Sequence, residues 1–258
     1  MHGDTKLLLT IDLGNSTAAY GLFEGSRLLA NGHTESNYIP FFMQLIAKCG
    51  VYKPVKKVII SSVVPELTYK IKKQLQNKLG RGSVYVVGKD LKLRVPMRYD
   101  RRKLGADRLV NLYGALHFYR SPLLVIDFGT AITFDYLSKS GVFEGGLIVP
   151  GVETSFRALV EQAALLPKVK EVAPVKGLVG RNTKAAMSSG LLNGFGALAD
   201  GLSGRFRAFY GRNLKTLVTG GFAARIAPFM AHVDYLDPLH TIRSLALIYR
   251  KEIEPKCR

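Results

Sequence analysis

The chain contains no tryptophan, and only two of its 258 residues are cysteines, Cys49 and Cys257. No Cys-x-x-Cys pair and no nearby histidine accompanies them, which argues against a zinc site and a disulfide framework. Long hydrophobic runs are missing as well. The first apolar stretch ends at Asp12, well short of a secretory signal or of the roughly 20 residues that cross a membrane. We therefore expect a cytoplasmic protein with no membrane partner.

Acidic residues are scarce. The 19 Asp and Glu residues are outnumbered by 37 Lys and Arg residues, and the formal net charge is +18. Such a charge attracts polyanions without specificity and steers phosphate-bearing ligands toward the protein. The basic residues are spread along the sequence, without a nucleic-acid-binding module or an alternation of aromatic and basic residues. We expect a solvated basic surface and no specific nucleic acid partner.

Apolar residues are plentiful at 47%, and the length suits two domains of about 100–150 residues each. Two segments of the chain resemble each other, residues 8–20 and residues 124–134. Each is an apolar run that ends in Asp-x-Gly and a small polar residue, followed by a second β-prone run. Each pattern predicts a β-hairpin whose glycine permits the turn.

Strands and helices are expected to alternate around both hairpins. In the first half, the patterns predict a strand over 26–32, a helix over 41–49, a strand over 58–62 and a helix over 66–79. In the second half, they predict a strand over 143–149, helices over 152–165 and 182–210, a strand over 216–219 and a helix starting near Gly221. The alternation predicts one α/β architecture used twice, with domains at 1–115 and 116–258 joined through a helix over about residues 104–118.

The two Asp-x-Gly turns are candidates for binding ATP. Backbone N–H groups at the tip of such a turn can bind phosphate, and the adjacent carboxylate can hold Mg²⁺ that bridges phosphate oxygens. One such turn alone is an ordinary β-turn. Two turns in matching positions, each after an apolar strand, indicate a nucleotide site in a cleft between the two domains. The sequence has no Walker loop.

Asp107 allows two interpretations. It precedes an apolar helical run over 109–118, so it could simply be an acid stabilised by the dipole at the start of a helix. It could equally be the general base that orients a substrate hydroxyl and accepts its proton. Phosphoryl transfer depends mainly on positioning and charge neutralisation, so one well-placed carboxylate can suffice.

Seven short motifs, in order, make the chain similar to the type III pantothenate kinase family, also called the Bvg accessory factor family, of the actin-like ATPase and sugar kinase superfamily. They are Asp12-Leu-Gly-Asn-Ser16, Ser61-Ser-Val-Val-Pro65, Gly105-Ala-Asp-Arg108, Asp127-Phe-Gly-Thr-Ala131, Gly145-Gly-Leu-Ile-Val-Pro-Gly151, Gly180-Arg-Asn-Thr183 and Thr219-Gly-Gly221. The resemblance covers nearly the whole chain. It implies a duplicated RNase H-like (actin-like ATPase) fold, with two mixed sheets, flanking helices and an inter-domain cleft.

The resemblance also implies roles for individual residues. ATP would be bound by Asp12, Leu13, Gly14, Asn15, Ser16, Thr17 and Thr130, with Asp12 near Mg²⁺. Asp107 would be the catalytic base. The substrate would be contacted by Tyr99, Gly105, Ala106, Asp107, Arg108 and Thr183. Asp127 would coordinate a monovalent cation, K⁺ or NH₄⁺, and the family is homodimeric, with Thr183 reaching the substrate across the dimer interface.

The implied reaction is ATP-dependent phosphorylation of pantothenate to 4′-phosphopantothenate, the first step of coenzyme A biosynthesis. Two alternatives remain open. One is a kinase of the same fold that acts on another small hydroxyl or carboxyl acceptor. The other is a non-catalytic regulatory accessory factor. The chain departs from the family pattern at Phe222, where an acid is usual, and over residues 237–244, where a more apolar pattern is usual.

Overall fold

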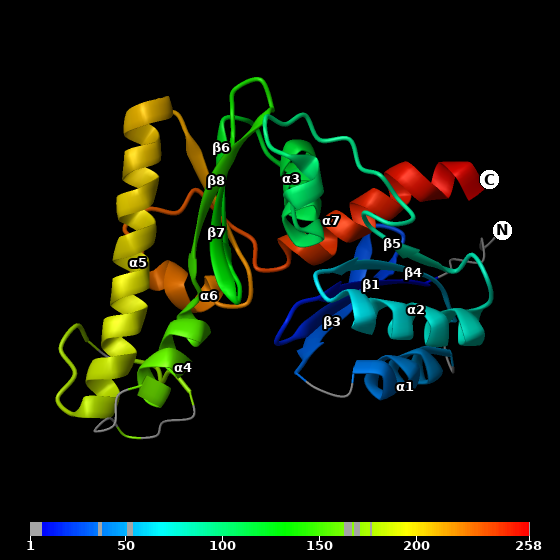
Figure 1. Ribbon diagram of the computed structural model, residues 1–258, viewed down its shortest axis with the longest axis horizontal. Helices are drawn as coiled ribbons and strands as arrows, with labels where there is room; N and C mark the ends of the chain where they lie inside the picture. The colour runs from blue at the N-terminus through cyan, green and yellow to red at the C-terminus, as the bar shows by residue number, and fades with distance from the viewer. Residues whose placement is uncertain are drawn as a thin grey trace. The chain divides into compact units, whose positions relative to one another are not determined.

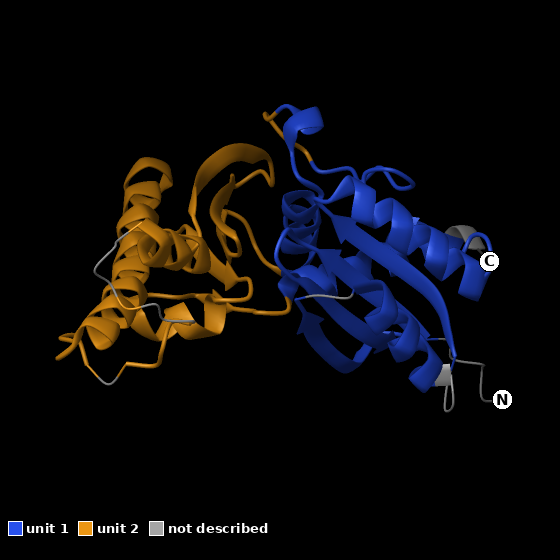
Figure 2. Ribbon diagram, turned by 60° about the horizontal axis from the view of Figure 1, so that its bottom comes forward, with its two compact units in different colours: residues 1–95, 100–118, 240–258 blue, residues 96–99, 119–239 orange. Residues whose placement is uncertain are grey.

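The computed structural model describes residues 7–35, 38–50, 54–162, 167, 171–175 and 177–257. The chain forms two compact units, coloured separately in Figure 2. Unit 1 contains residues 1–95, 100–118 and 240–258, and unit 2 contains residues 96–99 and 119–239. None of the helices in the described ranges is long and apolar enough to cross a membrane.

Unit 1 is built on a five-stranded mixed sheet with the order β3-β2-β1-β4-β5. Its strands are β1 (Leu7–Leu13), β2 (Ala18–Glu24), β3 (Arg27–Thr34), β4 (Val55–Ser62) and β5 (Val84–Val86). The first three strands form an antiparallel meander, because short turns join them. β4 runs parallel to β1 and β5 runs parallel to β4, which requires helical crossovers.

Helices cover both faces of this sheet (Figure 1). The helices of unit 1 are α1 (Tyr38–Gly50), α2 (Pro65–Leu79), α3 (Ala106–Phe118) and α7 (His240–Ile248). Alternate residues of β1, such as Leu9 and Ile11, are buried in a core with α1 and α2. The intervening residues of β1, which include Thr10 and Asp12, lie on the face covered by α3 and α7 because side chains alternate along a strand.

Unit 2 repeats the same plan, with the strand order β10-β9-β6-β7-β8. Its strands are β6 (Leu123–Phe128), β7 (Ala131–Leu137), β8 (Phe143–Pro150), β9 (Lys215–Thr219) and β10 (Tyr235–Leu236). Its helices are α4 (Val152–Gln162), α5 (Thr183–Tyr210) and α6 (Ala223–Ile226). Three of the strand β6 residues, Leu124, Ile126 and Phe128, belong to the core formed with α4, α5 and α6. The side chain of Asp127 therefore leaves the sheet on the opposite face.

The matching strand orders confirm the predicted duplicated α/β fold with two mixed sheets. The strands of the first repeat lie before residue 115 and those of the second repeat lie after residue 116. The domain limit at 115/116 itself stays a prediction. The compact units divide the chain differently, because α7 follows the second repeat in the sequence but belongs to unit 1. The fifth strand of each repeat is thus followed by a helix of unit 1, α3 after β5 and α7 after β10.

Close contacts hold α3 against α7. A Cβ atom at Gly114 of α3 would collide with Ser244 Oγ of α7, so only glycine fits where the helices meet. Polar contacts flank this point: Thr241 donates a hydrogen bond to Asn111 Oδ1 at 2.8 Å, and His240 Nε2 lies 2.9 Å from the Asn111 carbonyl oxygen. Residues 237–244, which depart from the family pattern, thus include two partners of α3.

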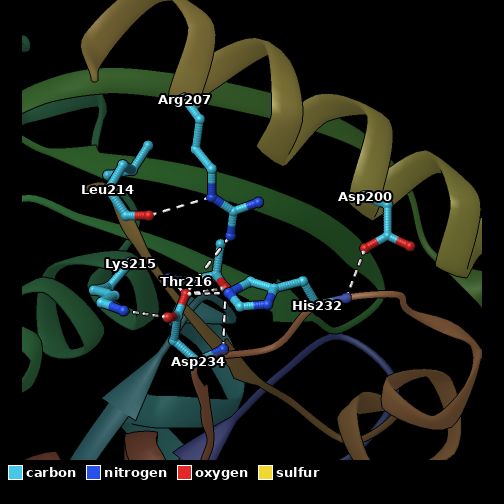
Figure 3. A network of polar contacts seen from close by, with 7 residues as sticks. All are labelled: Asp200, Arg207, Leu214, Lys215, Thr216, His232 and Asp234. Carbon is cyan, nitrogen blue, oxygen red and sulfur yellow. Dashed lines mark hydrogen bonds and ion pairs between the residues drawn. The ribbon is translucent and has the colours of Figure 1, made fainter. Parts of the chain in front are cut away.

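A polar network in unit 2 is centred on Asp234, which precedes β10 (Figure 3). Its carboxylate accepts hydrogen bonds from Lys215 Nζ at 2.8 Å and from the Thr216 amide at 2.9 Å, and it forms an ion pair with Arg207 of α5 at 3.6 Å. His232 Nε2 lies 3.2 Å away. Burial alone would raise the pKa of Asp234, but the hydrogen bonds from Lys215 and Thr216 and the nearby His232 lower it to about 2.

The predicted strands and long helices are present, with shifts of a few residues at their ends. The helix predicted over 152–165 is observed as α4 up to Gln162, and its last predicted residues lie outside the described ranges. The helix expected near Gly221 is a single turn, α6. Strands β5 and β10 and helix α7 were not predicted.

Candidate active site

The turn between β1 and β2 carries the predicted ATP-binding loop. It is closed by a hydrogen bond from the Gly14 amide to the Thr17 carbonyl oxygen at 2.9 Å. The hydroxyl of Tyr38, at the start of α1, donates to the Ser16 carbonyl oxygen at 3.1 Å. The side chains of Asn15 and Thr17 are exposed at the tip. The loop is therefore anchored at its base and presents its tip to solvent.

Asp12 stands near the end of β1, immediately before this loop. Its backbone pairs with Ser61 of β4, and both side chains leave the sheet on the face of α3 and α7. Burial raises the pKa of Asp12 to about 7, and the negative charge of Asp107 adds to the rise. Ser61 Oγ lies beside the carboxylate and favours its ionised form, although it falls outside strict hydrogen-bond geometry.

Asp107 is in the first turn of α3, as the sequence predicted. Its Oδ1 accepts a hydrogen bond from the Arg108 amide at 2.7 Å, so the helix start holds this carboxylate. The preceding Gly105 makes room for it, because a Cβ atom at this position would collide with Asp107 Oδ1. The helix-start interpretation of Asp107 is compatible with a catalytic one, since the same contacts that stabilise the helix also orient the carboxylate.

Unit 2 holds the equivalent turn. Asp127 stands near the end of β6, beside Thr219 at the end of β9. Gly220 follows with a backbone φ of 98°, and a Cβ atom at that position would collide with Asp127 Oδ1. The carbonyl oxygen of Thr130 accepts hydrogen bonds from the Gly151 amide at 3.0 Å and from Thr154 Oγ1 at 2.7 Å. The start of α4 thus fixes the turn.

The remaining predicted substrate residues are divided between the units. In unit 1, Gly105 and Ala106 are half-buried and Arg108 is buried. In unit 2, the ring of Tyr99 packs against the ring of Phe143, with the centroids 5.4 Å apart. Thr183 is exposed at the first position of α5, whose N-cap Asn182 accepts a hydrogen bond from the Ala185 amide.

Unit 1 alone therefore brings together the residues of the loop 12–17 and the segment 105–108. Unit 2 alone brings together Asp127, Thr130 and Gly220. The convergence of both groups on one cleft stays a prediction. Phe222, which departs from the family pattern, packs against the core of unit 2, and the guanidinium of Arg225 lies over its ring at 5.1 Å.

Two residues of this site received no role from the sequence, Ser61 and Thr219. Both belong to motifs that were recognised, but each ends an apolar strand, where a small polar residue is ordinary. The signal that could have revealed them is the register between parallel strands, which places each opposite a candidate carboxylate. Register is a property of the folded sheet and has no local pattern in the sequence.

Comparison with known proteins identifies the family. A model of the type III pantothenate kinases matches residues 8–205. The chain belongs to the type III pantothenate kinase family. A family member from Citrifermentans bemidjiense is 37% identical over 254 residues, which are 95% of this chain and 99% of that protein. A member from a Geobacillus species is 32% identical over 259 residues, covering 97% of this chain and 100% of that protein.

Solved structures with the same fold confirm the architecture that the family resemblance implied. A Sinorhizobium meliloti protein provisionally named 2-dehydro-3-deoxygalactonokinase gives a TM-score of 0.60 at 15% identity, over 96% of this chain and 97% of its own. The ethanolamine utilization protein EutJ from Carboxydothermus hydrogenoformans gives 0.53 at 13% identity, over 93% of this chain and 89% of its own. At these identities the likeness concerns the fold alone, so substrate assignment depends on the family and the site.

Proposed function

We propose that this protein phosphorylates pantothenate with ATP, giving 4′-phosphopantothenate and ADP. The supporting observation is the pair of neighbouring carboxylates in unit 1, Asp12 beside the exposed loop tip and Asp107 at the start of α3. A phosphotransferase needs a base for the accepting hydroxyl and an anionic group near the metal–phosphate complex. Family membership supplies the acceptor and the nucleotide.

In this reaction Asp107 accepts the proton of the terminal hydroxyl of pantothenate. The hydroxyl oxygen forms a bond to the γ-phosphorus, and the bond from that phosphorus to the bridging oxygen of ADP breaks. The Arg108 amide holds one oxygen of Asp107 at 2.7 Å, which leaves the other oxygen to face the substrate. Pantothenate is contacted by Gly105, Ala106, Arg108, Tyr99 and Thr183. ATP is contacted by residues 12–17 and Thr130.

The residues of unit 1 fit a divalent cation. Burial and the nearby charge of Asp107 destabilise the ionised carboxylate of Asp12, and a hard cation bound through oxygen ligands would stabilise it. Asp12 would hold Mg²⁺, directly or through water. When bound, Mg²⁺ neutralises the charge that develops on the phosphate oxygens.

Asp127 would hold the monovalent cation, K⁺ or NH₄⁺. This residue pairs with the hydroxyl-bearing Thr219 of β9, and its Oδ1 lies so close to Gly220 that only a glycine fits there. Carboxylate and hydroxyl oxygens are ligands that suit a hard cation.

A homodimer is part of the proposal. One face of α5 presents small residues at helical spacing, and nothing among the described residues lies within 4 Å of where their Cβ atoms would be. These are Gly190, Gly194, Gly201 and Gly204, with the exposed Ala197 between them. Rows of small residues let two helix backbones approach closely. The same helix begins at Thr183, so a dimer through α5 would bring this residue close to the interface.

The decisive experiment is an assay of the purified protein with ATP, pantothenate and Mg²⁺, with and without K⁺, in which the product is identified by mass spectrometry. We expect phosphopantothenate and ADP in equal amounts, and a rate that falls sharply without K⁺ or NH₄⁺. A substrate panel containing sugars, glycerol and acetate separates this function from a related kinase activity. ADP formed with another acceptor, and none with pantothenate, would refute the assignment.

A further inference from the structure

The junction between the first and fourth strands carries the same type of residue pair in both repeats. Asp12 of β1 lies opposite Ser61 of β4, and Asp127 of β6 lies opposite Thr219 of β9. Both strand pairs are parallel. Residues that lie opposite each other on neighbouring strands point their side chains to the same face of a sheet. Each carboxylate therefore has a hydroxyl-bearing side chain beside it.

The packing of neighbouring residues confirms these directions. Ile60 belongs to the core under α1 and α2, so Ser61 and Asp12 point to the other face of the unit 1 sheet. Val218 and Phe128 belong to the core under α5, so Thr219 and Asp127 point to the other face of their own sheet. The same pair thus occurs twice, on corresponding faces of two independently packed sheets.

Both hydroxyls are fully buried. Ser61 and Thr219 are each 0% exposed. Neither Ser61 Oγ nor Thr219 Oγ1 makes a hydrogen bond within strict geometric limits to any residue in the described ranges. A buried hydroxyl without a partner is costly, and its repeated occurrence beside a carboxylate requires an explanation.

We propose that Ser61 and Thr219 are positioning residues, which donate their hydroxyl hydrogens to the carboxylates of Asp12 and Asp127 and thereby fix the oxygens that face the bound cations. The inference rests on the proposed function, which gives Mg²⁺ to Asp12 and a monovalent cation to Asp127.

The chemistry requires such a residue. An ionised carboxylate has about four lone-pair positions on its two oxygens and can rotate between several arrangements. A hydroxyl that occupies one of these positions selects a single arrangement and leaves the others for the cation. Groups that orient metal ligands in this way commonly contribute about ten- to hundredfold to cation affinity. Serine and threonine suit the role because they are small enough for a strand end.

The test removes each hydroxyl and restores it. Ser61→Ala and Thr219→Val delete the donor, whereas Ser61→Thr and Thr219→Ser keep it. We expect Ser61→Ala to raise the Mg²⁺ concentration for half-maximal activity about tenfold or more, with the K⁺ requirement unchanged. We expect Thr219→Val to raise the K⁺ concentration for half-maximal activity by a similar factor, with the Mg²⁺ requirement unchanged. The conservative variants should restore wild-type values.

Two binding measurements do not depend on turnover. Calorimetry of ATP with and without Mg²⁺ should show that Ser61→Ala loses most of the Mg²⁺-dependent gain in affinity. The rise in melting temperature on adding KCl, measured against matched NaCl, should be smaller for Thr219→Val than for the wild type. Because neither measurement uses pantothenate, both can support or refute the positioning roles even if pantothenate is not the substrate.

Matched controls come from the same strands. Thr10→Val and Thr216→Val also delete a buried threonine hydroxyl, but these hydroxyls bond to the Gly21 carbonyl oxygen and to Asp234. They should lower the melting temperature without changing either cation requirement. The inference is overturned if Ser61→Ala and Thr219→Val change only the melting temperature, as the controls do, or if each changes both cation requirements equally.

Discussion

Asp107, at the start of α3, lies close enough to Asp12, at the end of β1, for its charge to raise the pKa of the Asp12 carboxyl. Two carboxylates so close together repel each other, and folding tolerates the repulsion only where the rest of the structure holds both in place. The β1–β4 register holds one and the first turn of α3 holds the other. The proposed division into a base and a cation ligand gives each carboxylate a separate use.

Replacing Asp107 with asparagine should lower kcat by about 10²–10⁴-fold, because the accepting hydroxyl loses its base. The melting temperature should stay close to that of the wild type, since an amide oxygen can still accept the bond from the Arg108 amide. Asp100→Asn is the matched control: Asp100 caps the short helix Arg101–Lys103 in the same segment and should leave kcat unchanged. Near-wild-type activity of Asp107→Asn would remove the base assignment.

Asp12 should make stability depend on pH in the metal-free protein. In the folded state its carboxyl keeps a proton up to a pKa of about 7, whereas its ordinary value is 3.8. The folded state then binds more protons than the unfolded state between these values, so the free energy of unfolding decreases as pH rises from about 4 to about 7. Asp12→Asn removes this dependence of stability on pH, because asparagine does not titrate and resembles the protonated aspartate side chain.

We therefore expect Asp12→Asn to melt near the wild-type temperature at pH 4 and above it at pH 8. For a chain of this size, each 1 kcal/mol gained corresponds to about 2–4 °C. Differential scanning calorimetry in the presence of a chelator measures both values. An equal rise in melting temperature at the two pH values would show that the titration of Asp12 is not the cause.

The Asp234 network should stabilise unit 2. Asp234→Ala leaves Lys215, Arg207 and the Thr216 amide without their shared acceptor, so it should lower the free energy of unfolding more than the loss of an exposed ion pair does. The stabilisation comes from a lowered pKa, so it is fully present above about pH 4 and is lost as pH falls toward 2. Urea unfolding at pH 7 and pH 3 should show a smaller difference between variant and wild type at the lower pH. Asp100→Ala, which removes an exposed pair with Arg102, should change stability little at either pH.

Basic residues are more frequent in residues 48–103 than in the chain as a whole. Residues 48–103 contain sixteen of the 37 Lys and Arg residues but only three of the 19 Asp and Glu residues. Such a field should speed the encounter with anionic ATP, so kcat/KM for ATP should fall with rising NaCl while kcat changes little. Replacing Lys92 and Arg94, both exposed, with glutamine should reduce this salt dependence more than replacing Lys139 and Arg212. Equal effects of the two double variants would mean that only net charge matters.

The small-residue face of α5 predicts how the proposed dimer can be broken. Ala197→Glu places a bulky charge in the middle of this exposed face and should convert the dimer into a monomer in light scattering at micromolar concentration. Activity at low protein concentration should fall with it, since Thr183 would no longer be held near its substrate. Lys139→Glu, at an exposed position of unit 2 outside α5, is the control. A variant that stays dimeric would exclude this face as the interface.

The sequence was sufficient for the repeat, because Asp12-Leu13-Gly14 and Asp127-Phe128-Gly129 mark the ends of two apolar strands with local patterns. It was also sufficient for the start of α3, where Asp107 precedes a clear helical run. Strand β10 (Tyr235–Leu236) was missed because it has two residues and no pattern of its own. Its place in the sheet comes from pairing with β9 and from the Asp234 contacts.

The partners of the carboxylates escaped prediction for a different reason. Ser61 and Thr219 acquire their positions only when parallel strands align, and that alignment depends on crossovers through α1 and the segment around α5. The assignment of α7 to unit 1 depends likewise on the fit between Gly114 and Ser244, which lie in different halves of the chain. Tertiary contacts of this kind leave no periodicity to detect.

The position of α7 has a consequence for biogenesis. Synthesis delivers α3 before residues 119–239 of unit 2, but α7, the helix that packs against α3, emerges only after residue 239. Until then the nascent polypeptide exposes the apolar surface that Ile242 and Leu245 later bury, and α3, which carries Asp107, lacks its packing against α7. The proposed catalytic centre can therefore be completed only once translation has passed the entire second repeat, and a chain that ends at residue 239 would lack the helix that packs against α3.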